Sequence, residues 1–291
     1  MTLVGVACCL CACVATTTTV ESPGDLRKET IFAVTEQLNL IKFNAGQPRL
    51  ILESRPLQGL PAGEKLLGID FRVARGVLYT LTASGRLYTI DTVTGVVKPV
   101  SDVVPAALPL TGSSFGFDFN PAADRIRVVS DSGLNLRLHP DTGAVVDGNA
   151  MEPGLQGDPA LAFAKGDVNF GRSPAVVAAA YTYNKKDEKL TTNYAIDRQL
   201  GALLMQGSRE GITPVVSFNT GLLTTVGSLG LGVLRDASFD IADVSGAAFA
   251  AVRTAAVPLV RLYVINLETG YAQAMGTVGK GEPLVGLAVE P

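Results

Sequence analysis

The sequence predicts an all-β protein, a β-propeller of about five four-stranded blades, with six blades as the alternative. Residues 68–97 and 116–145 align without a gap and form two copies of one repeat, offset by 48 residues. A hairpin of alternating apolar residues that closes on a glycine turn recurs along the chain. Repeats of about 40–50 residues with four short strands each are typical of propeller blades.

The earlier of these two aligned copies, which begins at residue 68, contains four predicted strands. The segments 68–73, 77–82, 86–91 and 96–100 are short and rich in Val, Ile, Leu, Tyr and Thr. Residues such as Gly, Ser and Asp separate them, which indicates turns between neighbouring strands. The repeats lack an apolar period of 3.6 residues with helix caps, so we expect strands rather than helices there.

The turn glycines of the hairpins predict the number of blades. In most of these hairpins an Asp or Asn at the strand end can accept hydrogen bonds from the turn amides, and the glycine can adopt a positive φ. A sixth blade would need one more hairpin within residues 213–227. The longer later spacings predict insertions near 166–174 and 208–232. The turn glycines are Gly46, Gly95, Gly143, Gly201 and Gly270, with spacings of 49, 48, 58 and 69 residues.

The two ends of the domain are expected to share one blade. The first repeat, residues 30–52, contains three strands and lacks the leading one. The last apolar segment, 284–289, matches that strand, because Gly286 aligns with Gly68. We therefore expect residues 284–289 to pair with residues 31–34 and to close the ring, which removes open strand edges.

Composition excludes two classes of protein. The chain has 291 residues, of which 47% are hydrophobic and 18% are charged, and its formal net charge is −3. That apolar content is sufficient for a full core, which excludes a disordered chain. Near-neutral charge without a basic block argues against nucleic acid as a partner.

The amino terminus is expected to direct export. Residues 3–15 form an uncharged run that is too short for a membrane helix of about 20 residues and fits the apolar part of a signal peptide. Leu10-Cys11-Ala12-Cys13 resembles a bacterial lipobox, in which Cys13 would carry the lipid. No Lys or Arg precedes the run, in departure from a typical signal peptide, and a plain signal peptide remains the alternative.

These features predict how the chain is divided into three parts and where in the cell the protein is located. Residues 1–13 would be the signal peptide with its lipobox, 14–29 a tether, and 30–291 a single propeller domain. The location would be the outer membrane, the periplasm or the cell surface, and the membrane would be contacted through the lipid alone.

Three aspartates occupy the same position in their repeats, namely Asp70, Asp118 and Asp240. A structural interpretation is that these carboxylates accept hydrogen bonds from neighbouring segments and satisfy unpaired amides. The alternative is that they meet near the central channel and bind a cation such as calcium through oxygen ligands. No other cofactor is expected.

No catalytic residue is assigned. The single histidine, His139, lies at a hairpin position that is Asp in other repeats. Ser114 lies in a G-x-S-x-G pattern, but that motif needs a strand before it and a helix after it, whereas a strand is expected to follow here. Arg125 and Arg127 alternate on one strand, where they could bind an anion or pair with neighbouring carboxylates.

The central part of the chain resembles a known family. The run 114–121, the strand 124–130 and the turn 140–143 are similar to the bacterial secreted family catalogued as domain of unknown function 4394. The repeated Leu-Tyr-x-Ile-Asp-x-x-Thr-Gly hairpin and the segment 178–182 also fit that family. The resemblance spans roughly residues 30–291 and implies an extracytoplasmic, propeller-like domain without a known activity.

Three functions follow as hypotheses. The first is a non-enzymatic binding or scaffold module that presents its loops and channel mouth to a protein or a small ligand. The second is a calcium-dependent propeller hydrolase or lactonase, for which Asp70, Asp118 and Asp240 are the candidate ligands. The third is a structural subunit of an envelope or surface assembly.

Overall fold

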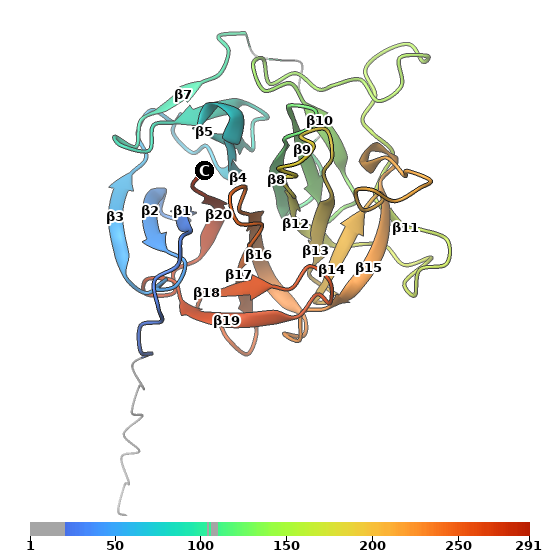
Figure 1. Ribbon diagram of the computed structural model, residues 1–291. Helices are drawn as coiled ribbons and strands as arrows, with labels where there is room; N and C mark the ends of the chain where they lie inside the picture. The colour runs from blue at the N-terminus through green and yellow to red at the C-terminus, as the bar shows by residue number, and fades with distance from the viewer. Residues whose placement is uncertain (1–20, 104, 106–109) are drawn as a thin grey trace, which may run out of the picture.

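Five β-sheets surround a central axis in a computed structural model that describes residues 21–103, 105 and 110–291 (Figure 1). Blade one contains β20 (Leu284–Val289), β1 (Thr30–Thr35), β2 (Asn39–Asn44) and β3 (Ile51–Pro56), from the axis outward. Blade two contains β4 (Leu66–Arg72), β5 (Val77–Thr82), β6 (Leu87–Ile90) and β7 (Val97–Pro99). Blade three contains β8 (Phe115–Asn120), β9 (Arg125–Ser130) and β10 (Asn135–Leu138).

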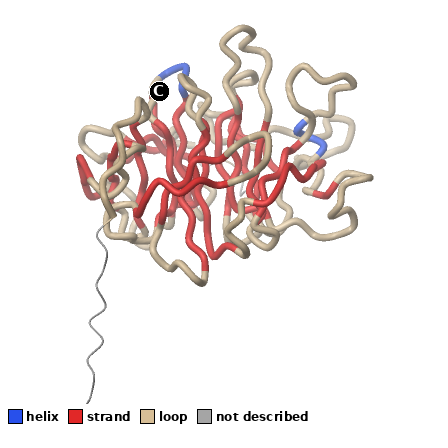
Figure 2. The backbone as a smooth tube through the Cα atoms, turned by 60° about the horizontal axis from the view of Figure 1, so that its bottom comes forward, coloured by secondary structure: helices blue, strands red, loops and turns tan. Residues whose placement is uncertain are grey.

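Blade four contains β12 (Val176–Tyr181), β13 (Asn193–Asp197), β14 (Ala202–Gln206), β15 (Leu222–Ser228) and the outer strand β11 (Ala162–Phe163). Blade five contains β16 (Leu234–Ile241), β17 (Ala248–Thr254), β18 (Arg261–Ile265) and β19 (Ala272–Thr277). Two short 3-10 helices, η1 (Val73–Arg75) and η2 (Phe218–Thr220), are the helices of the described residues. Figure 2 shows the strands as a central layer with loops on both faces.

The chain closes on itself as its repeats predict. Strand β20 pairs antiparallel with β1, with Ile31 opposite Val289 and Ala33 opposite Leu287. The carboxyl terminus thus supplies the innermost strand of the amino-terminal blade. Five apolar clusters then fill the five junctions between neighbouring blades, so each blade buries both faces of its sheet.

Five blades are confirmed, and residues 213–227 do not form a sixth. The second half of that segment is β15, the outer side of blade four, and the first half is a loop that contains η2. The predicted insertion at 208–232 is therefore wrong in its extent, because regular structure resumes at Leu222. The predicted insertion at 166–174 is confirmed as a loop between β11 and β12.

Blades three and four depart from four strands. After β10, the chain makes a single bridge between Leu138 and Val145 in place of a fourth strand. Arg137 and Arg127 hold Asp158, and these ion pairs keep the following loop folded back against the blade. The chain then reaches blade four, where β11 adds a fifth strand parallel to β15.

The hairpin turns have the predicted chemistry. Asp91 Oδ1 accepts hydrogen bonds from the amides of Val93 and Thr94, both at 2.9 Å, and Asp197 and Asn266 do the same in blades four and five. The turn glycines of blades two to five have positive φ, whereas Gly46 of the weaker first hairpin does not.

Glycines on the innermost strands allow these strands to lie close to one another. A Cβ on Gly116 would lie 2.7 Å from the backbone nitrogen of Ala179 on the next blade. A Cβ on Gly68 would lie 2.7 Å from the Cβ of Phe117, and one on Gly286 would lie 2.8 Å from the nitrogen of Ile69. Repeated glycines at this level of the ring therefore set the narrow bore of the channel.

The predicted export features lie outside the described residues, including the apolar run 3–15 and Cys13. Part of the predicted tether is described: the Thr277 amide donates to Glu21 at 2.7 Å, and Glu21 also pairs with Arg261 at 3.0 Å. Across the part of the chain that is described, no helix has the length and apolar character needed to cross a membrane.

Candidate functional site: an aspartate triad at the centre of the ring

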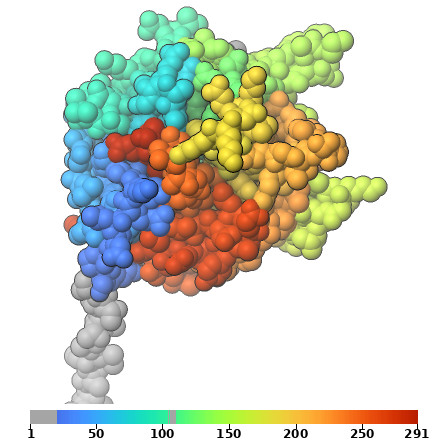
Figure 3. Space-filling model, viewed as in Figure 1, coloured from blue at the N-terminus to red at the C-terminus, as the bar shows by residue number. Residues whose placement is uncertain are grey.

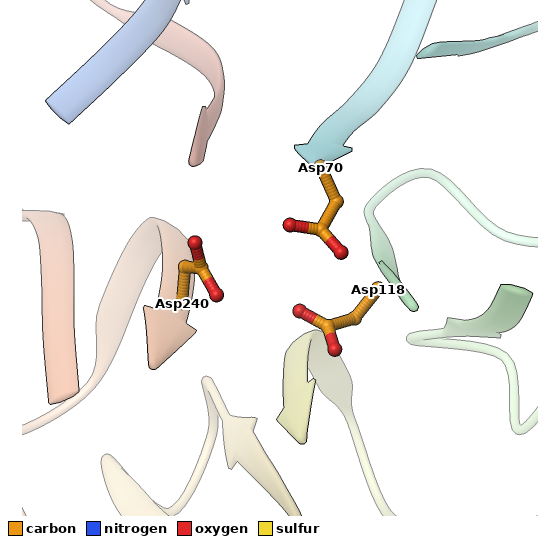
Figure 4. Close-up of side chains that lie close together, drawn as sticks. All are labelled: Asp70, Asp118 and Asp240. Atoms are coloured by element: carbon orange, nitrogen blue, oxygen red, sulfur yellow. The ribbon is translucent and has the colours of Figure 1, made fainter. Parts of the chain in front are cut away.

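The structure brings the three predicted aspartates together. Asp70 lies on β4, Asp118 on β8 and Asp240 on β16, each near the end of an innermost strand. Their side chains point toward one common centre (Figure 4), and one carboxylate oxygen from each lies within 4.8 Å of the others. All three residues are buried. We refer to them as the aspartate triad.

The triad joins innermost strands across the axis. Asp70 Oδ2 accepts the amide of Phe119 at 2.7 Å, and Asp118 Oδ1 accepts the amide of Tyr181 at 2.9 Å. Asp240 Oδ2 accepts the amide of Val289 at 2.6 Å. Each carboxylate therefore links its own blade to the following one, at three of the five junctions.

Two further hydrogen bonds bring the number of backbone amides that the triad accepts to five. The remaining oxygens of Asp70 and Asp240 accept the amides of their own neighbours, Phe71 at 2.7 Å and Ile241 at 2.6 Å. One amide on each of the five innermost strands is thus satisfied by the triad. Because a buried amide without an acceptor is costly, three aspartates are sufficient for a ring of five blades.

One oxygen of the triad is left over. Asp118 Oδ2 accepts no hydrogen bond from the residues that the structure describes, whereas the other five oxygens each accept one. The predicted structural role is therefore present in the geometry. The convergence required by the cation interpretation is also present, so the two interpretations share one arrangement.

Burial shifts the carboxyl groups of the triad toward the protonated state. Burial, and then the charge of Asp240, raises the pKa of Asp70 well above its usual range. Burial, and then the charges of Asp70 and Asp240, does the same for the pKa of Asp118. Burial raises the pKa of Asp240 to about 6. Asp118 Oδ2 can carry a proton without the loss of a hydrogen bond from a described amide, because the other five oxygens each accept one.

A funnel opens where the innermost strands begin. Its volume is about 600 Å³, and residues from the innermost strand of every blade line it, including Leu66, Phe115, Val177, Ala237 and Val285. A narrow neck of about 20 Å³ continues along the axis. We call this side of the ring the funnel face.

The opposite side, where the innermost strands end, is the triad face. It carries a pocket of about 310 Å³. The loop between β12 and β13, yellow in Figure 3, stands over the middle of this face. The triad residues line neither the funnel nor this pocket, so they lie beneath the surface from both sides.

The other candidates have structural surroundings. His139 lies in a hairpin, where its Nδ1 accepts the amide of Asp141 at 3.2 Å. Ser114 directly precedes β8, so a strand follows it as expected, and its amide donates to Asp131 at 3.3 Å. The nucleophile-elbow context is therefore missing at Ser114.

Pairing of Arg127 with a carboxylate is confirmed. Its Nη1 donates to Asp158 Oδ2 at 2.6 Å, and both side chains are 1% exposed. The same guanidinium donates to the Tyr181 hydroxyl at 3.1 Å and to Asn219 Oδ1 at 2.7 Å. Arg125 instead donates to the carbonyl of Asp124 at 2.8 Å. Arg127 thus fastens two long loops to the junction of blades three and four.

Tyr183 lines the pocket of the triad face, a position that the repeat pattern does not predict. Burial, and then the charges of Asp70, Asp118 and Asp240, raises the pKa of Tyr183 well above its usual range. Its position two residues after β12 is the feature from which it could have been found, because the triad also lies at strand ends.

Comparisons with solved structures give similar folds. A chain of a nidogen/laminin complex has a TM-score of 0.48 and 10% identity, and the match covers 90% of this chain and 98% of that one. A protein of unknown function from Bacteroides thetaiotaomicron has a TM-score of 0.47 and 12% identity, with 82% of this chain and 57% of that one covered. YCF48 from Cyanidioschyzon merolae has a TM-score of 0.38 and 11% identity, with 88% and 68% covered.

No curated protein matches the chain. A family model matches residues 39–288, which include all three triad aspartates and strands from every blade. The protein is therefore a β-propeller that belongs to the family described as domain of unknown function (DUF4394).

Proposed function

We propose that the protein is a non-enzymatic binding or scaffold module that receives a polar group of its partner in the funnel. The observation that carries this proposal is the convergence of all five innermost strands on one hollow of about 600 Å³. Concave sites of this size suit ligand binding. A larger hollow of about 710 Å³ lies between blades five and one, and it draws on those two blades alone.

The charges of the funnel suggest what it accepts. Glu36 and Asp236 lie close to Arg253, which neutralises part of this wall. Lys65 and Arg235 line the funnel and form no ion pair within the described residues. Among the described residues, these two unpaired cations stand against one unpaired carboxylate, that of Glu64, and so favour a partner that places an acidic or strongly polar group in the funnel.

Site-specific crosslinking in the native host tests the proposal. A photoreactive amino acid replaces Leu67, which lines the funnel and leaves both cations in place, and a matched variant carries it at Lys98, on the outer strand of the same blade. We expect a discrete covalent adduct from position 67 and none from position 98. No adduct at position 67, or equal adducts at both positions, would overturn the assignment of the funnel.

Export and a lipid anchor at Cys13 belong to the same proposal. They rest on the Leu10-Cys11-Ala12-Cys13 pattern and on the apolar run before it. Mass spectrometry of the membrane fraction is expected to find a chain that begins with a lipid-modified Cys13. A chain that begins with an unmodified Met1 would contradict the anchor, and Cys13→Ser should release the protein from the membrane.

A calcium-dependent hydrolase or lactonase is the second candidate, because the triad oxygens converge within 4.8 Å. Carboxylate oxygens are the ligands that calcium prefers. Calorimetric titration with calcium tests it: binding heat, together with ester or lactone turnover that Asp118→Ala abolishes, would support this function. Absence of both heat and thermal shift would exclude it and leave the triad as a structural hub.

A further inference from the structure

The pocket of the triad face has features of a second binding site, separate from the funnel. Its volume is about 310 Å³, at the lower end of the range of small-molecule sites. Its walls include the aromatic rings of Phe119 and Tyr183, and its charged lining includes Arg72, Lys185, Glu188 and Asp243. These residues come from the ends of innermost strands and from the loops that follow them.

The positive charges of this pocket are already engaged. Arg72 Nε donates to Asp124 at 2.8 Å, and Arg72 Nη1 donates to Asp141 at 2.6 Å. Lys185 Nζ donates to the carbonyl of Val244. An anionic ligand would therefore have to displace an existing bond in order to reach either cation.

Of the three carboxylates that line the pocket, Asp124 pairs with Arg72 and the other two are not engaged. Neither Glu188 nor Asp243 forms an ion pair or a side-chain hydrogen bond with another described residue, and Asp243 is half-buried. The amide of Phe119 donates to Asp70 Oδ2 at 2.7 Å, so the triad lies directly behind this wall of the pocket. The pocket thus holds two carboxylates without a partner among the described residues, beside the aromatic side chain of Tyr183.

We propose that this pocket binds a small organic cation, a primary amine or a quaternary ammonium compound. Tyr183 lines the pocket as its half-buried aromatic side chain, the core residue Phe119 closes the wall behind it, and Asp243 and Glu188 supply the opposite charge. A cation near an aromatic ring gains electrostatic attraction, which increases when water is excluded. Apolar substituents on the nitrogen suit the Val73, Ala74 and Pro121 side of the pocket.

Isothermal titration calorimetry on the full domain tests the site with choline, benzylamine and 2-phenylethylamine as probes. The matched neutral probe is 3,3-dimethylbutan-1-ol, which has the shape of choline without its charge. We expect at least one cation to bind and the neutral probe to bind at least tenfold more weakly. Equal binding of choline and its neutral isostere, or no heat from any of the three cations, would overturn the proposal.

Two substitutions locate the binding. Asp243→Asn should weaken cation binding by about tenfold, since tenfold corresponds to about 1.4 kcal/mol, and Tyr183→Leu should weaken it by severalfold. Glu64→Gln on the funnel face is the control and should leave the affinity unchanged. Unchanged affinity in Asp243→Asn and Tyr183→Leu would place the cation elsewhere and refute the site. The wild-type comparison of choline with its isostere stays decisive if either variant fails to fold.

Discussion

Asp70 Oδ2 accepts the backbone amide of Phe119 at 2.7 Å and thereby joins the innermost strands of blades two and three. Both partners are buried at the axis of the ring. The same relationship links Asp118 to Tyr181 and Asp240 to Val289. The centre of this propeller is thus held by carboxylates and amides in addition to apolar packing.

The hydrogen bonds predict opposite outcomes for two conservative substitutions. Asp70→Asn replaces one accepting oxygen with an NH₂ group that faces a backbone amide, so it should destabilise the fold by about 1–3 kcal/mol. Asp118→Asn keeps the bond to Tyr181 through its oxygen and can donate from its NH₂ group, so it should be tolerated. Urea denaturation of both variants measures the difference, with exposed Asp102→Ala as the control. Equal destabilisation by the two variants would contradict this account.

The triad predicts that stability falls as pH rises from about 5 to above 7. A carboxyl group with a raised folded-state pKa binds more protons when folded, so its stabilising contribution is complete below the unfolded pKa of about 3.9 and is lost as pH passes the folded pKa. Burial raises the pKa of Asp240 to about 6, and those of Asp70 and Asp118 are also raised. The urea midpoint should therefore be lower at pH 7.5 than at pH 5.0.

Groups with a lowered pKa act in a different window. The hydroxyl and backbone amide of Ser113 are among the groups that hold the pKa of Asp131 below its usual value, against its burial, and such groups lose their contribution below about pH 4. In Asp118→Asn, one titrating carboxyl is absent, so the difference between pH 5.0 and 7.5 should shrink. A midpoint that rises from pH 5.0 to 7.5 in the wild type would refute the preference of the triad for protons.

The closing strand predicts a severe effect of a short truncation. Deletion of residues 284–291 removes β20, exposes one edge of β1 and takes away the Val289 partner of Asp240. We expect a large fall in the melting temperature, which circular dichroism or calorimetry would measure. Glu290→Gln is the control, because it removes the ion pair with Lys42 and leaves the strand in place. A truncated chain that melts like the wild type would show that the ring does not depend on the clasp.

The close approach of the innermost strands predicts that Gly116→Ala destabilises the fold. A Cβ at this position would lie 2.7 Å from the nitrogen of Ala179 and from a methyl carbon of Val129. Overpacking of this kind costs about 1–3 kcal/mol, which denaturant unfolding would measure. Gly76→Asn is the control: that position has a φ of 61° in the left-handed region, which asparagine tolerates, and open space around it. A neutral Gly116→Ala would mean that blades three and four can move apart freely.

The buried ion pair predicts a large effect of Arg127→Met. Asp158 would remain buried with Arg137 as its remaining cationic partner, and Asn219 Oδ1 would lose the donor that Arg127 supplies. Removal of one member of a buried pair costs about 3–5 kcal/mol. Arg125→Met on the same strand should have a much smaller effect. Similar unfolding curves for both variants would contradict the role of Arg127.

The sequence by itself determined the blades, because each blade is a local repeat whose strand pattern and turn chemistry are contained within about 50 residues. Gly68, Gly116 and Gly286 marked the innermost strands, and the missing first strand near Thr30 revealed the closure of the ring. The common repeat position of Asp70, Asp118 and Asp240 also followed from the sequence alone.

What the tertiary structure decided is how distant segments meet. That three carboxylates satisfy amides from all five blades depends on the closed ring, since the partners are up to 63 residues apart along the chain. Contacts between repeats also decide three other features: the shortened blade three, the course of the loop that Arg127 holds, and the pocket that Tyr183 lines. Local periodicity carries no information about such contacts, because they form after the blades have packed around the axis.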